Sequence, residues 1–263
     1  MKEILRKPLI GYLFERLSYS KRIDRIVLAT SLGKDNDMLC QYIASQRFAV
    51  YRGSEEDVLN RFYEAAGKYH PKVKGRPFGS SPRQRRGTAS SPPRQGGVAS
   101  DAVIVRVTGD SPLIDPVVCD GLIDFYLKGK ADYACLSQRF AEGVDCEVFA
   151  YEALVAAYKN AQLKSEREHV TPYIYNHPEL FQKAVMENTT DDSRYRFTVD
   201  EPEDFDTVKE IIQALYRQGA EPFTVEEIKK FIDAHPGSGR KNAHIVRNEG
   251  YSKSLREDGA AEP

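Results

Sequence analysis

Two aspartates of this chain each follow a short, largely apolar run. Asp110 comes after residues 101–107 and Asp200 after residues 195–199, and both runs are typical of strands. Open α/β sheets bind ligands at the carboxyl ends of their strands, where a lone acid beside a glycine can hold a metal-bound phosphate. If the two strands are near neighbours, both carboxylates can share one divalent ion. Each aspartate also precedes a helix led by proline, so spacing alone favours a capping role for either one.

A second set of polar side chains falls on the predicted strands themselves. Asp145 and Glu147 are two residues apart and therefore point to one face. Acids are costly to bury unless they bind something, so this pair can accept hydrogen bonds from ligand hydroxyls. A strand side that faces solvent explains the pattern nearly as well. Arg106 points to the same side as Thr108 and Asp110, where it can contact an anion or form an ion pair with a neighbouring acid.

The elements that must position these residues alternate along the chain. Strand-like runs separated by helical patterns predict an α/β fold with a mainly parallel sheet covered on both faces. The predicted strands are residues 25–30, 47–51, 101–107, 132–136, 145–149 and 195–199. The predicted helices are residues 8–20, 37–46, a segment that begins at Ser54, a segment that begins at Asp115, and residues 151–161, 166–176, 202–217 and 224–234.

One stretch interrupts this order. Residues 72–100 are rich in Gly, Ser, Pro and Arg, contain no acid and have almost no apolar residue. Such a composition cannot offset the entropy of ordering, so we expect a disordered basic insert. The insert could attract nucleic acid electrostatically, but no aromatic residues are interleaved with its arginines and no folded platform carries them, so we expect a solvated basic linker. Residues 1–71 and 101–257 then form a single domain, followed by a loose tail at 258–263.

Composition narrows the class of protein. The chain has 263 residues, 41% of them hydrophobic and 29% charged, and a formal net charge of −1. This balance gives no overall attraction to nucleic acid or membrane. No run approaches the roughly 20 apolar residues of a spanning helix, and the N-terminus lacks a signal-peptide pattern, so we expect a cytoplasmic protein. The four cysteines form no C-x-x-C pair, which argues against zinc and thioredoxin-like chemistry.

Seven stretches together resemble one known family. They are residues 7–10 (KPLI), 51–59 (YRGSEEDVL), 106–115 (RVTGDSPLID), 143–149 (GVDCEVF), 166–174 (EREHVTPYI), 198–204 (TVDEPED) and 242–251 (NAHIVRNEGY). In this order they resemble the cytidylyltransferase-like family, which includes spore coat polysaccharide biosynthesis proteins and is related to acylneuraminate and Kdo cytidylyltransferases. Any one stretch alone is a weak signal, whereas seven in order are specific.

The resemblance implies a fold and an activity. The fold would be a three-layer α/β/α sandwich of the nucleotide-diphospho-sugar transferase type, with a mostly parallel mixed sheet. The activity would be transfer of a nucleotidyl group, with CMP from CTP as the expected case, to a sugar or sugar acid, with release of pyrophosphate, for synthesis of a surface polysaccharide or glycan. By analogy with the family, Asp110 and Asp200 would bind Mg²⁺, which neutralises the charge of the triphosphate.

The same resemblance suggests an acceptor pocket. Residues 167–169 form a helical turn that faces this pocket in the family, where Arg167 can pair with a sugar carboxylate and serve catalysis by orienting the acceptor. His169 and the acids Asp145 and Glu147 would contact the same substrate. His169 can act as a general base, although a structural hydrogen bond is the commoner role of a lone helical histidine. The family also often forms a homodimer through the region near residues 140–175.

Two departures from the family pattern bear on activity. The family begins with an apolar strand and a phosphate-binding loop of the type A-R-x-x-S-x-R-L-P-G-K, and this chain starts just after the place where that loop would end. The second departure is the insert at 72–100, where the family has a short connection. We therefore expect weak or no activity for the chain as written. The alternative is a non-catalytic protein of the same fold that binds a partner enzyme or a sugar ligand.

Overall fold

The computed structural model describes residues 1–69, 102–239, 241–245, 247 and 249–260. The expected disordered insert at 72–100 lies outside these residues. So does the end of the expected loose tail, whereas residues 258–260 belong to the last helix. No helix in the described parts of the chain is both long enough and apolar enough to cross a bilayer.

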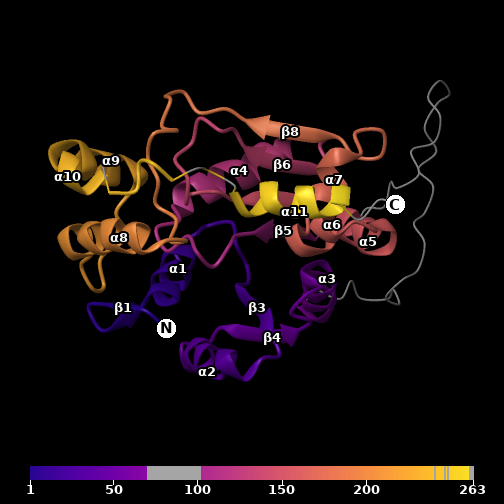
Figure 1. Cartoon of the computed structure of the whole chain (residues 1–263), viewed down its shortest axis with the longest axis horizontal. Helices are drawn as coiled ribbons and strands as arrows, with labels where there is room; N and C mark the ends of the chain where they lie inside the picture. Colours follow the sequence, from indigo (N-terminus) through magenta and orange to yellow (C-terminus); the bar gives the residue numbers. More distant parts are fainter. Residues whose placement is uncertain (70–101, 240, 246, 248, 261–263) are drawn as a thin grey trace.

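A four-stranded sheet forms the centre of the molecule (Figure 1). Its order is β5 (Val103–Arg106), β7 (Glu147–Ala150), β6 (Tyr133–Leu136) and β8 (Lys183–Met186). β7 runs antiparallel to both of its neighbours, and β6 and β8 are parallel, so only β7 opposes the common direction. The sheet is therefore mixed, with three of its four strands in the same direction.

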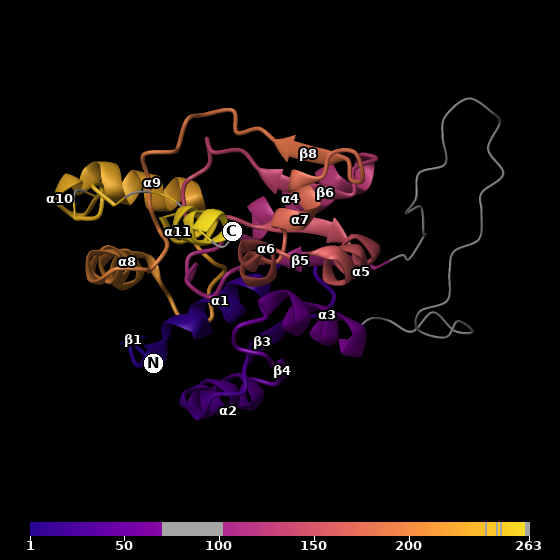
Figure 2. The ribbon, with the colours of Figure 1, turned by 45° about the vertical axis from the view of Figure 1, so that its right-hand side comes forward.

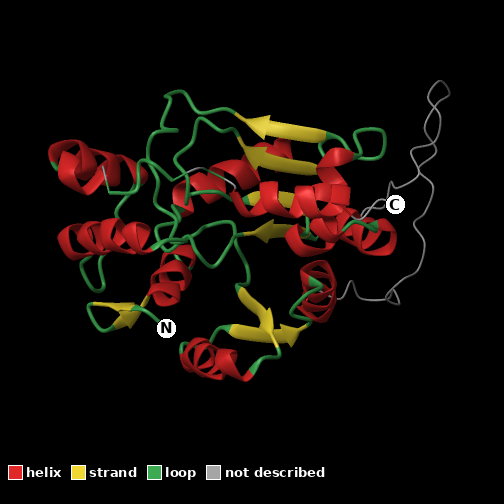
Figure 3. Cartoon of the chain, viewed as in Figure 1, coloured by secondary structure: helices red, strands yellow, loops and turns green. Residues whose placement is uncertain are grey.

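Two smaller strand pairs lie beside this sheet. A parallel pair joins β3 (Val27–Ser31) to β4 (Ala49–Gly53), and a short antiparallel hairpin joins β1 (Glu3–Ile4) to β2 (Lys7–Pro8). Figure 3 shows the yellow strands with red helices beside them, and β8 forms the upper edge of the central sheet in this view. The helices are α1 (Leu9–Leu17), α2 (Asp37–Ser45), α3 (Val58–Tyr69), α4 (Pro116–Lys128), α5 (Tyr151–Asn160), α6 (Lys164–His169), α7 (Pro172–Asn176), α8 (Pro202–Leu215), α9 (Val225–Ala234), α10 (Pro236–Gly239) and α11 (Glu249–Ala260), with a short 3-10 turn at Lys34–Asn36.

The two faces of the central sheet are covered by different helices. Side chains of a strand alternate between the faces, so neighbouring residues of β7 reach different cores. Val148 joins the cluster that contains Leu122 of α4, and Phe149 joins the cluster that contains Leu154 of α5. All four side chains are fully buried, and each such burial contributes about 1.5–3 kcal/mol. The expected three-layer α/β/α sandwich is confirmed.

Several predicted elements differ from the structure. Residues 195–199 do not form a strand; their one β-bridge joins Arg196 to Glu142. The predicted helix at 166–176 is two helices, because Val170 adopts a positive φ of 75° and Pro172 starts a new turn. The strand β8 was not predicted, because its four residues are too few to show a period, and the helix α11 was not predicted, because its sequence is too polar to show one.

Candidate functional site

A cavity of about 580 Å³ opens at the carboxyl end of β5. Its wall combines the ends of β5 and β6, the start of β7, residues 108–111 and residues 196–201. The turn between α6 and α7 and two residues near the C-terminus, Ile245 and Tyr251, complete it. Seven of the eight predicted site residues line this cavity, namely Arg106, Thr108, Asp110, Asp145, Glu147, His169 and Asp200.

Asp110 is fixed by hydrogen bonds from its own loop. Thr108 Oγ1 and Ser111 Oγ both donate to Asp110 Oδ1, at 2.5 and 3.0 Å. The carbonyl of Asp110 accepts from the backbone N of Val199 at 2.8 Å and from Thr198 Oγ1 at 3.3 Å. These cross-bonds hold the loop after β5 beside the segment that leads to Asp200, although about ninety residues of sequence separate them.

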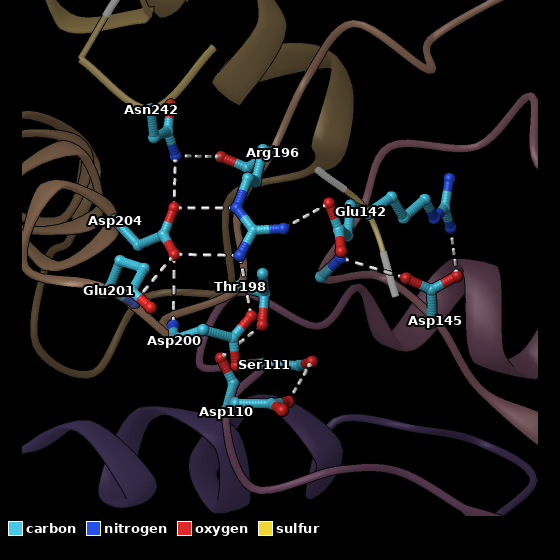
Figure 4. Close-up of polar contacts among 12 residues, drawn as sticks. Asp110, Ser111, Glu142, Asp145, Arg196, Thr198, Asp200, Glu201, Asp204 and Asn242 are labelled. Carbon is cyan, nitrogen blue, oxygen red and sulfur yellow. Dashed lines mark hydrogen bonds and ion pairs between the residues drawn. The ribbon is translucent and has the colours of Figure 1, made fainter. Parts of the chain in front are cut away.

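Asp200 lies beside Asp110 in the same corner (Figure 4). Its Oδ2 accepts a hydrogen bond from Arg196 Nη2 at 2.7 Å, and its side chain is 48% exposed. Burial raises the pKa of the Asp200 carboxyl and the charge of Asp110 raises it further, whereas Arg196 acts in the opposite direction. A carboxylate that is destabilised by a second carboxylate is one that a cation would stabilise.

Neither aspartate acts as a helix cap. The N-cap of α4 is Asp115, whose carboxylate accepts from the backbone N of Val117 at 2.8 Å. The N-cap of α8 is Glu201, and Asp204 accepts from the backbone N of Glu201 at 3.1 Å. The capping alternative for Asp110 and Asp200 is therefore wrong, because other acids occupy both positions.

Arg196 organises this corner, and the sequence did not single it out. It donates to both oxygens of Asp204, at 2.8 and 3.0 Å, and forms an ion pair with Glu142 at 2.5 Å (Figure 4). The side chains of Arg196 and Asp204 are 8% and 0% exposed. Asn242 adds a bond to Asp204 Oδ1 at 2.8 Å, and these bonds hold the pKa of Asp204 below its usual range although burial acts to raise it. Such a buried charge requires partners of this kind.

Gly143 allows the chain to approach this corner closely. Its φ is +93°, and a Cβ on it would lie 2.4 Å from the backbone N of Thr198. Only glycine fits here, since a side chain would both strain the backbone and collide with it. The bonds of Glu142 to Tyr195 O and of Phe197 N to Glu142 O depend on this approach.

The other end of the cavity is built around Glu147. Its Oε2 accepts from Arg106 Nη1 at 2.6 Å, and its Oε1 accepts from Tyr133 at 2.5 Å and from Thr171 at 2.8 Å. Arg106 therefore forms the ion pair that was one of its two expected roles. Asp145, which the sequence placed on the strand, precedes β7 and is still in the wall.

Asp145 accepts from Arg247 Nη2 at 2.6 Å and from the backbone N of Gly143 at 3.1 Å. Its enclosure in the cavity wall raises its pKa, against the opposing effect of Arg247.

His169 lies nearby with Nε2 3.0 Å from Ser254 Oγ, and burial lowers the pKa of its imidazole. A neutral imidazole can accept a proton, so both expected roles of His169 stay open.

Arg167 is the predicted residue that the structure does not bring to the cavity. It forms an ion pair with Asp57, which lies just before α3, and it donates to the carbonyl of Tyr158 at 2.9 Å. Its guanidinium also lies 5.3 Å from the centre of the Tyr158 ring. The expectation that Arg167 faces the acceptor pocket is therefore not met, because the arginine joins α6 to α3 and α5 instead.

The residues of the corner fit a magnesium ion better than a metal that needs a full protein cage. In the described residues, no group of three or more His, Cys, Asp or Glu side chains is arranged to hold a metal. Mg²⁺ commonly takes one or two carboxylates and completes its octahedron with phosphate oxygens and water. Within the described structure, Oδ2 of Asp110 and Oδ1 of Asp200 receive no hydrogen bond, so each can serve as a ligand.

The chain is similar to several known proteins. A family model described as cytidylyltransferase matches residues 1–82 and 95–243. An uncharacterized protein of Methanocaldococcus jannaschii is 32% identical over 92% of this chain and 86% of its own length. The spore coat polysaccharide biosynthesis protein SpsF of Bacillus subtilis is 30% identical over 77% of this chain and 71% of its own length.

The chain is also similar to several solved structures. A cytidylyltransferase from Leptospira borgpetersenii has a TM-score of 0.75 and 26% identity, over 93% of this chain and 90% of that chain. A CMP:2-keto-3-deoxy-manno-octonic acid synthetase complexed with CTP has a TM-score of 0.53 and 11% identity, over 81% and 90% of the two chains, which supports the fold. The match of the family model to most of the sequence, together with the 32% and 30% identical relatives, shows that this chain belongs to the cytidylyltransferase family.

Proposed function

We propose that this protein is a Mg²⁺-dependent cytidylyltransferase that transfers CMP from CTP to a hydroxyl of a sugar or sugar acid and releases pyrophosphate. The observation that carries the proposal is the convergence of Asp110 and Asp200 in one cavity of a cytidylyltransferase fold. The name of SpsF refers to spore coat polysaccharide biosynthesis, and one structural neighbour is complexed with CTP. Synthesis of a surface polysaccharide or glycan is the pathway we infer.

The proposed mechanism assigns the metal to the aspartate corner. Asp110 and Asp200 would hold Mg²⁺, and the bound ion would neutralise the triphosphate and orient it. Arg196 keeps Asp200 in place through its 2.7 Å bond. The acceptor would lie toward Glu147, Asp145 and His169, where carboxylate and imidazole atoms can accept hydrogen bonds from its hydroxyls.

A second candidate function follows from the charge of the cavity. Its wall carries six carboxylates, from Asp110, Glu142, Asp145, Glu147, Asp200 and Glu201, and two arginines. Arg106 is paired with Glu147, and Arg196 with Glu142, Asp200 and Asp204. In the described part of the chain, neither cavity arginine is left unpaired to meet a triphosphate. A non-catalytic protein that binds a sugar or a partner enzyme is the alternative that this arrangement favours.

A pyrophosphate-release assay distinguishes the two functions. CTP, ATP, GTP and UTP are each combined with Mg²⁺ and a panel of sugars and sugar acids. Release that depends on CTP, on Mg²⁺ and on one acceptor supports the enzyme, and its loss in Asp110→Asn assigns the activity to this site. Calorimetric binding of a sugar without pyrophosphate release in any combination would support the non-catalytic alternative.

We further propose that the protein acts in the cytoplasm as a homodimer. Light scattering coupled to size exclusion measures the mass directly, against 29.7 kDa for one chain. A monomeric mass at micromolar concentration would contradict the dimer.

A further inference from the structure

The C-terminal part of the chain crosses the molecule from α10 to α6. Figures 1 and 2 show α11, in yellow, lying in front of the central sheet and beside α6. Ile245 and Tyr251, from this part of the chain, line the cavity, and both lie beyond residue 243, where the match to the family model ends. We use the name strap for residues Asn242–Ile245, Arg247 and α11.

One end of the strap is firmly fixed. Asn242 is only 3% exposed, and its side-chain amide donates to the carbonyl of Arg196 at 3.2 Å and to Asp204 at 2.8 Å. These bonds tie the beginning of the strap to the arginine that positions Asp200. Because the partners are buried and charged, this attachment is costly to break.

The middle of the strap is held by Arg247. One guanidinium nitrogen donates to Asp145 Oδ1 at 2.6 Å, and another donates to the carbonyls of Phe140 at 3.1 Å and Gln138 at 3.2 Å. Asp145 is itself a cavity residue, so this clamp connects the strap directly to the cavity wall. The Asp145 side chain remains 44% exposed, which makes this bond weaker than the buried anchor.

Among its described side chains, the far end of the strap is held by polar bonds and by ring contacts of Tyr251 with His169 and Tyr175. Ser254 lies 3.0 Å from His169 Nε2 and donates to Glu168 at 3.0 Å, and the Lys164–Glu257 pair is 67% and 41% exposed. Among the described side chains of α11, Ser254 alone is buried. A helix with so little apolar burial belongs to the elements that open at low free-energy cost.

Tyr251 is the residue that this end brings to the cavity. Its ring meets the edge of His169 at a centroid distance of 5.1 Å and lies 6.5 Å from Tyr175. His169 and Tyr175 line the same end of the cavity as Glu147. A rigid aromatic surface next to carboxylate acceptors offers both an apolar face and hydrogen bonds to a ring that carries hydroxyls.

We propose that the strap forms the outer wall of the acceptor end of the cavity, swings open about Asn242 to admit substrate, and places Tyr251 against the acceptor sugar. Tyr251 is then a specificity-determining residue contributed by the C-terminal helix α11. The assignment of this end to the acceptor rests on the proposed function. The opening of the strap does not rest on the proposed function, and a separate experiment tests it.

The acceptor contact is tested by steady-state kinetics with CTP and the best acceptor of the panel. We expect Tyr251→Ala to raise the acceptor KM about tenfold and Tyr251→Phe, which keeps the ring, to stay near wild type. The matched control is Leu255→Ala on the same helix, where the side chain is 45% exposed and lines no part of the cavity. Equal acceptor KM values for wild type and Tyr251→Ala would overturn the proposal that Tyr251 contacts the acceptor sugar.

Strap opening is tested by the reactivity of Cys135, which lines the cavity. In a Cys40→Ser background, a disulfide reagent is applied at pH 8.5, because burial raises the pKa of the Cys135 thiol. Cys119 and Cys146 are buried, and peptide mass analysis separates the modification of Cys135 from that of Cys146, which also lines the cavity. We expect Arg247→Ala to speed the modification of Cys135 roughly fivefold or more, and the exposed Arg256→Ala to leave it unchanged.

Equal rates of Cys135 modification in wild type and Arg247→Ala would overturn the proposal that the strap opens. The rate of Cys135 modification can be measured without any enzymatic turnover, so it tests the opening of the strap independently of the proposed cytidylyltransferase function. Absence of pyrophosphate release from the wild type would defeat the proposed function alone, whereas unchanged Cys135 labelling would defeat the strap alone.

Discussion

The two ends of the cavity use the same residue types in different ways. At one end, Asp110 and Asp200 each keep one carboxylate oxygen without a hydrogen bond in the described structure. At the other end, Glu147 accepts three side-chain donors and Asp145 accepts two, so that every oxygen of both acids has a donor. Carboxylates that keep an oxygen without a protein donor can bind a cation, whereas carboxylates whose oxygens are all held by protein donors form a preorganised wall, whose remaining lone pairs can still accept from a ligand.

This difference teaches that charge alone does not identify the chemistry of a site. Each end contributes carboxylates from loops and strand ends, and at each end arginine side chains pair with them. What distinguishes them is how many lone pairs the protein itself uses. The predictions below test that distinction, from the largest expected effect to the smallest.

Removal of either free carboxylate should abolish activity. We expect Asp110→Asn and Asp200→Asn each to lower kcat on the order of 1000-fold, because the charge that holds the metal is lost while the shape is kept. Pyrophosphate release at saturating CTP measures this loss, and circular dichroism checks that the fold is retained. Activity within tenfold of wild type would show that these acids are not the metal pair.

Arg196 should matter chiefly for stability. Arg196→Met leaves Asp204 and Glu142 buried without their partner, so we expect a loss of about 3–5 kcal/mol in the free energy of unfolding. The matched control is Arg194→Met, since the Arg194–Asp233 pair is 68% and 52% exposed and should contribute about 1 kcal/mol or less. Urea titrations compare the two variants. Equal losses would mean that the Arg196 corner is not the buried hub we describe.

The raised pKa of Asp200 gives a smaller effect with a definite sign. Between the usual aspartate pKa of 3.8 and the raised pKa of the folded protein, the folded state binds more protons than the unfolded state. Stability therefore falls as pH rises through that window, and the ionised carboxylate is unfavourable at pH 7 without metal.

We accordingly expect Asp200→Asn, measured with EDTA, to gain a little stability relative to wild type at pH 7 and to lose that gain near pH 3. Denaturant titrations at both pH values measure the difference. A variant that is less stable than wild type at pH 7 would show that the bond to Arg196 outweighs the repulsion by Asp110.

Arg167 should have the smallest effect on catalysis. Because its side chain pairs with Asp57 outside the cavity, we expect Arg167→Met to change the acceptor KM by less than about twofold and stability by about 1 kcal/mol. Steady-state kinetics with sugar-acid acceptors measures the KM of wild type and of Arg167→Met. A large rise of KM restricted to acceptors with a carboxylate would restore the role that the sequence suggested.

Much of the fold could be predicted from hydrophobic patterns. β5 and α4 were predicted because an apolar run and an Asp-Pro start mark them clearly, and Asp115 does cap α4. The segment 195–199 misled the prediction, because its alternation comes from a buried Arg196 with three acidic partners rather than from a strand with one polar face. Periodicity reports burial and does not reveal which groups a buried side chain meets.

The candidate site also contains residues that the sequence indicates and residues that only the structure reveals. Asp110 and Asp200 stand out in the sequence because each ends an apolar run and belongs to a recognisable motif. Arg196 does not stand out, because no local pattern shows that its side chain is buried among Glu142, Asp200 and Asp204. Arg247 does not stand out, because it binds Asp145 from 102 residues away. Arg167 belonged to a matching motif, and only its contact with Asp57 showed where the side chain lies.

The amino-acid sequence by itself determined the class of fold, the family and the two aspartates, because these depend on local order and on residue types. Only the tertiary structure decided which carboxylates keep free oxygens, which arginines are paired, and that the C-terminal helix brings Tyr251 to the cavity wall. Those properties arise from contacts between segments far apart in the chain, whose geometry no local pattern encodes.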